Sequence, residues 1–331
     1  MVAGAVRPAP RRARARHEVG RTAQGHQGQT VSRPRAADRN GRRPELPAIL
    51  KAKRYREASV FSAANLLREA RRQKSLPEGR VPRVCLLDPD GDIVRALVAE
   101  GRSRRDPNWA CYHTDLHVVA LEGGSVGVVG CAVGASFAVL VAEELFACGC
   151  ELLISITSAG QIVERADPPY FVLIENALRD EGTSYHYLPP SQFSLMPSGL
   201  DRRLRDAFNG LPEPVYRGAS WTTDAPFRET ETAIKRCREL GILAVEMEAA
   251  ALYAFASAKR KPVVCFAHVT NRMARIEGDF EKGAANGAHD ALALVDAVMR
   301  RCDAARRRGS RPRLNPESPG HLPATRPPGL K

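Results

Sequence analysis

The segment Gly241–Ala250 reads Gly-Ile-Leu-Ala-Val-Glu-Met-Glu-Ala-Ala and joins a short apolar run to an alanine-rich stretch. Its first half predicts the end of a buried strand, and its second half predicts the start of a helix at residues 248–257. Glu246 and Glu248 flank Met247 at this junction. Acids in a first helical turn complement the helix dipole, which would explain both without a functional role. The alternative is a sugar site, in which a carboxylate binds adjacent hydroxyl groups and Met247 packs on the apolar face.

Apolar runs of strand length alternate with helical patterns on both sides of this segment. We expect strands at residues 84–87, 117–121, 126–131, 152–156, 170–174, 215–222, 244–245 and 262–269. We expect helices at residues 63–73, 93–100, 137–146, 229–240, 248–257 and 288–301. This alternation predicts an α/β fold with a mixed, largely parallel sheet that helices cover on both faces. Ligands of such sheets bind beyond the carboxyl ends of the strands.

Polar residues follow several of these strands and form the further candidates for a site. They are Asp92, Thr157, Ser158, Arg179, Phe227, Arg228, Asn271 and Arg272. Small hydroxyl residues after a strand can meet an anion or a sugar. Asparagine and arginine there can neutralise the charge that develops on a leaving base. A plain turn, a surface arginine or an N-cap at Asp224 would leave similar sequences, so no single segment decides the chemistry.

The formal net charge of +13 is confined to the two ends of the chain. Residues 1–45 carry +8 and residues 303–331 carry +5, so the centre is neutral. Both ends are rich in Arg and Pro and poor in large apolar side chains, which predicts disordered basic tails around one domain at residues 46–302. We interpret the first tail as an overextended start or a solvated segment. A transit peptide and a nonspecific nucleic-acid arm are the alternatives, although the neutral centre disfavours nucleic acid as a partner.

The positions of the cysteines and the lengths of the apolar runs predict the cellular compartment and whether a metal is bound. Most of the eight cysteines lie within apolar runs, as small buried side chains of a reducing compartment do. Their spacing with histidine does not match a zinc site. The sequence contains neither a secretory apolar region nor a run of 18 apolar residues. We therefore expect a cytoplasmic protein without a metal ion or a membrane partner.

Three segments together resemble the nucleoside phosphorylase family. They are Ala142–Leu145, Ser158–Gly160 and, most specifically, Gly241–Ala250. This family includes uridine phosphorylase, hexameric purine nucleoside phosphorylase and the methylthioadenosine nucleosidases, and the resemblance covers residues 83–300. It implies a sandwich around a distorted barrel and a homo-oligomer that is a trimer, a hexamer or a dimer. It also implies cleavage of a nucleoside N-glycosidic bond with phosphate as co-substrate and without a metal or organic cofactor.

The resemblance assigns roles to the residues of the central segment and of the expected turn at residues 157–160. Glu248 would bind the ribose hydroxyls, Met247 would pack on the ribose, and Glu246 would help to line the base pocket. Ser158 takes the position of the family's hydroxyl that faces phosphate or sugar, with Thr157 beside it.

The remaining assignments concern the base. Purine enzymes of the family carry an aspartate where this chain has Asn271. The pair Asn271–Arg272 resembles uridine phosphorylase, in which the arginine stabilises the leaving pyrimidine, and this favours a pyrimidine or a noncanonical base over a purine. Phe227, Arg228 and Arg179 complete the expected substrate-binding set.

The phosphate-binding part of the family pattern is altered in this chain. The family's Gly-Asp-Pro-x-Arg turn reads Leu87-Asp-Pro-Asp-Gly91 here, so its glycine and its arginine are absent. Ser155 replaces a second arginine, and residues 109–112 offer no counterpart for a third. The family still implies phosphate as the acceptor of the sugar, and water is the alternative. In the alternative, Asp92 would be the general base that activates the water. Asp92 could also be only an acid at the N-terminus of a helix. A nucleoside-binding module without turnover is the third possibility.

Overall fold

The computed structural model describes residues 46–309, except residues 52, 274 and 276. The tail expected at residues 1–45 lies outside this range, as does the part of the second expected tail, at residues 303–331, that follows residue 309. The last helix, α8 (Ala288–Gly309), continues beyond the domain end expected at residue 302. Alanine and arginine, which are both strong helix formers, dominate residues 304–308 and extend the helix. The boundary expected at residue 302 is therefore too early.

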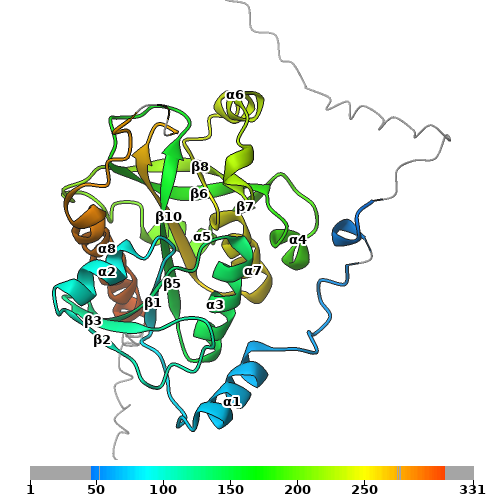
Figure 1. Ribbon diagram of the computed structural model, residues 1–331, viewed down its shortest axis with the longest axis vertical. Coiled ribbons are helices and arrows are strands. Elements are labelled where there is room, and N and C mark those ends of the chain that lie inside the picture. Colours follow the sequence, from blue (N-terminus) through cyan, green and yellow to red (C-terminus); the bar gives the residue numbers. More distant parts are fainter. Residues whose placement is uncertain (1–45, 52, 274, 276, 310–331) are drawn as a thin grey trace, which may run out of the picture. The chain divides into compact units, whose positions relative to one another are not determined.

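A mixed ten-stranded sheet forms the centre of the fold (Figure 1). Its strands are β1 (Val84–Asp88), β2 (Ser103–Arg105), β3 (His117–Leu121), β4 (Gly124–Gly130), β5 (Leu152–Gln161), β6 (Tyr170–Asp180), β7 (Phe193–Leu195), β8 (Val215–Thr223), β9 (Ala244–Glu246) and β10 (Val263–Asn271). Five of their pairings are parallel and five are antiparallel among the described residues. The mixed α/β sheet is confirmed, with a larger antiparallel share than expected.

Five of the strands close into a barrel. Strand β10 pairs with both β5 and β6, so the path β5–β9–β8–β6–β10 returns to β5. The sheet continues from β5 through β1, β4 and β3 to β2, and β7 pairs with β6. The strands expected at residues 117–121 and 126–131 are present as β3 and β4, which form an antiparallel hairpin that pairs Leu121 with Gly124.

Helices cover the sheet on both sides. They are α1 (Ala63–Lys74), α2 (Asp92–Ala99), α3 (Ala135–Ala147), α4 (Ser184–Tyr187), α5 (Ser198–Arg203), α6 (Glu231–Glu239), α7 (Ala249–Lys259) and α8, with 3-10 turns η1 (Ala48–Leu50), η2 (Pro226–Arg228) and η3 (Ala284–Gly287). Figure 1 shows α3 and α7 on one side of β1 and β5, and α2 and α8 on the other. A bilayer-spanning helix, which would have to be both long and apolar, is not found between residues 46 and 309.

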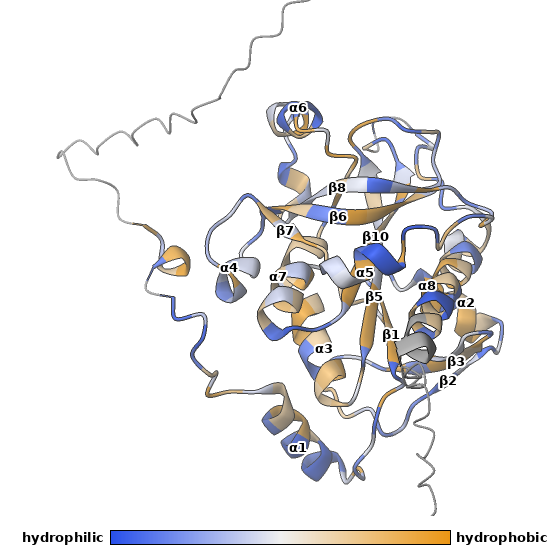
Figure 2. Ribbon diagram, turned by 180° about the vertical axis from the view of Figure 1, so that it is seen from behind, coloured by the Kyte–Doolittle hydropathy of each residue, from blue (hydrophilic) through white to orange (hydrophobic). Residues whose placement is uncertain are grey.

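The central strands are apolar on both faces and form the core. Every residue of β10 is buried, and Figure 2 shows β5 largely in the orange of hydrophobic residues. Several strands run further than their apolar content suggests. Strand β5 continues to Gln161, β6 to Asp180 and β10 to Asn271, because neighbouring strands bond their polar ends. The segments expected as turns at residues 157–160 and 179–180 are therefore strand ends.

Candidate active site

The carboxyl ends of three parallel neighbours, β1, β5 and β10, meet at one edge of the sheet. They bring the turn after Asp88 together with Thr157, Ser158 and the end of β10. The junction between β9 and α7 adds Glu248, whose Oε1 accepts a hydrogen bond from the backbone N–H of Gly134 at 2.7 Å. These expected residues thus lie together at the carboxyl ends of the strands.

Both carboxylate oxygens of Glu246 accept hydrogen bonds from groups of the protein. Its Oε2 accepts the backbone N–H groups of Glu248 and Ala249, both at 2.7 Å, which caps α7. Its Oε1 accepts the hydroxyls of Ser220 at 2.9 Å and Thr222 at 2.5 Å. With four donors on a carboxylate that is 3% exposed, Glu246 holds the junction in place. The structure therefore gives it a capping role, not the expected place facing a base.

Glu248 is buried next to Glu246 but has fewer partners. Its Oε2 accepts the backbone N–H of Met247 at a long 3.3 Å, so this oxygen keeps free hydrogen-bonding capacity. Burial, and then the charge of Glu246, raise the pKa of Glu248, whereas hydrogen bonds from Gly134 and Thr157 lower it in part. Met247 beside it is half-buried. A polar carboxyl next to a partly exposed thioether suits a sugar ring with one polar and one apolar face.

The turn after β1 is organised by Asp88. Its two oxygens accept the backbone N–H groups of Gly91 at 3.1 Å and Val94 at 2.9 Å. Gly91 has a φ of 76°, a left-handed conformation that glycine adopts without strain, so the residue at this point of the turn carries no side chain. Burial raises the pKa of Asp88 to about 6.

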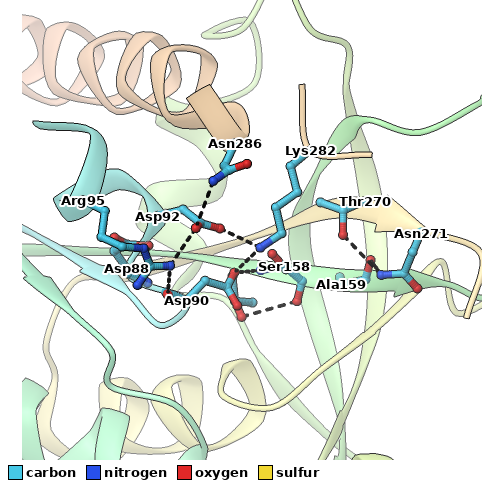
Figure 3. A network of polar contacts seen from close by, with 12 residues as sticks. Asp88, Asp90, Asp92, Arg95, Ser158, Ala159, Thr270, Asn271, Lys282 and Asn286 are labelled. Carbon is cyan, nitrogen blue, oxygen red and sulfur yellow. Dashed lines mark hydrogen bonds and ion pairs between the residues drawn. The ribbon is translucent and has the colours of Figure 1, made fainter. Parts of the chain in front are cut away.

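Asp90 reaches from this turn across to β5. Its Oδ2 accepts the backbone N–H of Ser158 at 2.8 Å and lies 3.9 Å from Nζ of Lys282 (Figure 3). A backbone N–H at the end of a strand, with a lysine nearby, can bind an anion. In this chain the anion at that position is the protein's own carboxylate.

Asp92 lies in the same cluster, but cations and an amide surround its carboxylate. It accepts Nζ of Lys282 at 2.6 Å, Nη2 of Arg95 at 2.7 Å and Nδ2 of Asn286 at 3.5 Å. Burial raises its pKa, but the hydrogen bonds and charges of Lys282 and Arg95 outweigh burial and lower it below the usual value. A carboxylate paired with two cations is a weak base, so the geometry does not favour Asp92 for the role expected of it.

His268 on β10 faces the same region from the other side. Its ring stacks on Phe171, with the centroids 4.6 Å apart. Burial, and then the charge of Lys282, lower its pKa to about 4, so it is neutral at neutral pH. The Nε2 atom has no hydrogen-bond partner among the described residues.

The neighbouring side chains of Asn271 and Arg272 lie in different environments at the end of β10. Asn271 is buried beside β5, where its Nδ2 donates to Thr270 Oγ1 at 3.2 Å and to the carbonyl of Ala159 at 3.5 Å. The side chain of Arg272 is 47% exposed and pairs with Asp167. The structure thus places Asn271 at the strand ends with Ser158, and turns Arg272 outward to an ion pair.

The last three expected substrate residues lie away from this cluster. Arg179 is buried and donates to Ser184, to Ser191 and to two carbonyls, so it fixes residues 184–191. Phe227 is 99% exposed and Arg228 is exposed on the same 3-10 turn. None of the three therefore contacts Glu248, Ser158 or Asp90 in this structure.

Sequence reasoning missed Lys282 and gave His268 no role. Lys282 lies in the loop before η3, 190 positions after Asp92, and no local pattern marks it. His268 lies within the strand expected at residues 262–269. Its signal was an ionisable residue within a run of otherwise apolar side chains.

A cavity lies at the amino ends of β1 and β5, opposite the strand ends that carry the candidate site. It measures about 790 Å3 and is lined by Val84 and Leu152, which begin β1 and β5, and by Arg83 and Arg104. None of the expected site residues lines it.

Comparisons with known proteins identify the family of this chain. Guanosine phosphorylase from Halorubrum lacusprofundi is 26% identical over 189 residues, which are 56% of this chain and 73% of that protein. Uridine phosphorylase from Vibrio fischeri superposes with a TM-score of 0.57 at 18% identity, over 70% of this chain and 98% of the other. Purine nucleoside phosphorylase from Toxoplasma gondii, in complex with immucillin-H, superposes with a TM-score of 0.57 at 16% sequence identity. The superposition covers 70% of this chain and 94% of the other. The sequence pattern of the phosphorylase superfamily matches residues 83–300. Because this match spans more than half of the chain, and the closed mixed barrel is the fold of the nucleoside phosphorylase structures, the chain belongs to the phosphorylase superfamily.

Proposed function

We propose that this protein cleaves the N-glycosidic bond of a nucleoside and transfers the sugar to water. Membership of the superfamily supports the cleaved bond. One contact supports the acceptor: the carboxylate of Asp90 accepts the backbone N–H of Ser158. A phosphate at this N–H would have to displace Asp90 and would meet the charges of Asp88 and Asp92 nearby.

The sugar is held at the β9–α7 junction in this proposal. Met247 packs against the apolar face of the ribose, and the free capacity of Glu248 Oε2 binds a ring hydroxyl. Glycosidic cleavage develops positive charge at the anomeric carbon, and a carboxylate near the 2-hydroxyl binds more tightly as that charge grows. The short bonds that fix Glu246 keep Glu248 in place, so little reorganisation is needed during the reaction.

The water is activated by Asp90 in this proposal. Among the three acids of the turn, Asp92 pairs with two cations and Asp88 binds backbone N–H groups through both oxygens. Asp90 has one oxygen on Ser158 and a side chain that is 33% exposed, which leaves its other oxygen able to take a proton. The reaction needs a positioned nucleophile and charge stabilisation, and these residues supply both without a metal or organic cofactor.

The test is a nucleoside screen with purified protein in phosphate-free buffer and in buffer with phosphate. The panel includes uridine, guanosine, adenosine and methylthioadenosine, and chromatography measures the free base and the sugar product. We expect base release without phosphate, with free ribose as the second product. Release that requires phosphate and yields ribose 1-phosphate would overturn the choice of water, and no release from any nucleoside would overturn the enzyme assignment.

Phosphate is the second candidate acceptor, and Lys282 is the observation that favours it. Its ammonium lies within 3.9 Å of the oxygen that sits on the Ser158 N–H, so a cation and a backbone donor already face one position. A relative that is 26% identical is named guanosine phosphorylase. Phosphorolysis would require the Asp90 side chain to rotate out of this position.

A further inference from the structure

A small cavity lies between the carboxyl-end parts of β1, β5 and β10 and residues of α2, η3 and α8. Its volume is about 20 Å3, and its polar lining includes Asp88, Asp90, Thr157, Ser158 and His268. A cavity that holds one water molecule needs roughly 10–15 Å3 and two to four polar partners. The space therefore fits a single water, whereas inorganic phosphate, with five non-hydrogen atoms, is too large for it.

His268 has a buried polar atom that lacks a partner at this cavity. The residue is 6% exposed, and its Nε2 has no hydrogen-bond partner among residues 46–309. Because its lowered pKa keeps the ring neutral, each ring nitrogen needs a partner of its own. Buried polar atoms in native proteins are nearly always paired with protein or water. A water in the space that His268 lines would supply the partner that this nitrogen lacks.

Two residues of the cavity lining, Thr157 and Asp90, also act on Glu248 of the proposed sugar site. Thr157 lines the cavity and hydrogen-bonds Glu248, and the charge of Asp90 is close enough to Glu248 to raise its pKa. Thr157 therefore links this space to the carboxyl that the proposed function assigns to the ribose.

We propose that this cavity holds the acceptor water and that His268 positions it. This inference rests on the proposed hydrolysis. The Nε2–H group of His268 donates to the water oxygen, and Asp90 accepts one of the water protons. One lone pair of the oxygen is thereby left to face the anomeric carbon.

The step balances without another reactant. The water oxygen forms a bond to the anomeric carbon as the bond from that carbon to the base nitrogen breaks. The electron pair of the broken bond leaves with the base, which takes up a proton from solvent. Asp90 takes the proton that the water loses and then releases it to solvent, so the products are ribose and free base.

The first test compares His268→Gln with His268→Leu, two side chains of similar size that differ in their ability to donate a hydrogen bond. Wild-type hydrolysis of one nucleoside is measured first. We expect His268→Leu to lower kcat on the order of 10- to 100-fold with KM within about threefold, because the water loses its donor while the sugar site is intact. His268→Gln should recover most of kcat. The control is His289→Leu, which removes a histidine that is 51% exposed and lies outside the cavity lining.

The second test uses methanol as a competing acceptor. His268→Ala enlarges the cavity by most of an imidazole ring, so the ratio of methyl riboside to ribose in methanol–water mixtures should rise several-fold above that of the wild type. An unchanged ratio, or equal kcat values for His268→Leu and the wild type, would overturn the inference. A wild type that cleaves only with phosphate, or cleaves nothing, would instead overturn the proposed function.

Discussion

Replacement of Asp90 by alanine should change the acceptor of the sugar from water to phosphate. In the wild type, Asp90 Oδ2 occupies the Ser158 N–H and lies 3.9 Å from Lys282 Nζ. Asp90→Ala removes the proposed general base, which typically contributes 100- to 10,000-fold, or about 3–5 kcal/mol of transition-state stabilisation. Hydrolysis should therefore fall by at least about two orders of magnitude.

The same change should create an anion site. At an effective dielectric constant of about 20, a charge 3.9 Å from Lys282 interacts with it by roughly 4 kcal/mol. Because Asp90 is about a third exposed, we take about half of this value, roughly 2 kcal/mol, as available to an incoming phosphate. Affinity for phosphate should then rise on the order of 30-fold, since 1.4 kcal/mol corresponds to a factor of ten.

The assay follows base release by wild type and Asp90→Ala over a phosphate titration, with the sugar product identified by chromatography. The control is Asp115→Ala, which removes an exposed carboxylate that pairs with Arg105 away from the site. We expect phosphate to have no effect on the wild type and to restore turnover of the variant. Undiminished hydrolysis by Asp90→Ala in phosphate-free buffer would refute the reasoning.

Three further changes test the sugar carboxyl, the helix cap and the buried histidine. Glu248→Gln should lower kcat/KM by two or more orders of magnitude, because an amide cannot ionise as positive charge develops on the sugar, whereas the Glu248 carboxyl, whose pKa is about 8, can; steady-state kinetics check this. Thr222→Val leaves the N–H of Ala250 and an oxygen of Glu246 short of a partner, so urea unfolding should show a loss of about 2–3 kcal/mol. Since the pKa of His268 is about 4 when folded and 6.5 ordinarily, wild-type stability relative to His268→Gln should fall by up to roughly 3 kcal/mol between pH 7 and pH 4, as measured by urea unfolding at each pH.

Each of these predictions has an outcome that contradicts it. Activity of Glu248→Gln within a few fold of the wild type would show that the sugar is bound elsewhere. A Thr222→Val protein as stable as the wild type would show that water replaces the lost hydroxyl. For His268, the unfolded chain binds a proton that the folded chain excludes, so a stability difference that is constant with pH would mean that the folded ring titrates normally.

The strands and the acidic junction between β9 and α7 were predictable because they depend on local pattern. Continuous apolar runs marked every strand of the barrel, and the Glu246–Glu248 junction stood out as acids at the border of a strand and a helix. The separate roles of these two acids were not predictable. They depend on Ser220 and Thr222 of β8, which approach Glu246 only after that strand has packed beside β9.

The expected cationic residues were the least predictable part of the site. Arg179 and Arg272 follow strands, as ligand-binding arginines do, but each meets a closer partner in the folded chain. The cation that reaches the cluster, Lys282, comes from a loop whose position depends on packing around η3. A side chain that long can reach many places, so its sequence position does not reveal its partner.

Closure of the barrel also has a consequence for folding. The pairing of β1 with β4 joins residues 42 positions apart, whereas the pairing of β5 with β10 joins Leu153 to Val263, 110 positions apart. Long-range pairings cost more loop entropy and form slowly. Thr157 and His268 lie on the two strands that make this distant pairing, so the site exists only after the ring has closed. Recovery of ligand binding during refolding should therefore report the last step of barrel assembly, later than the return of secondary structure.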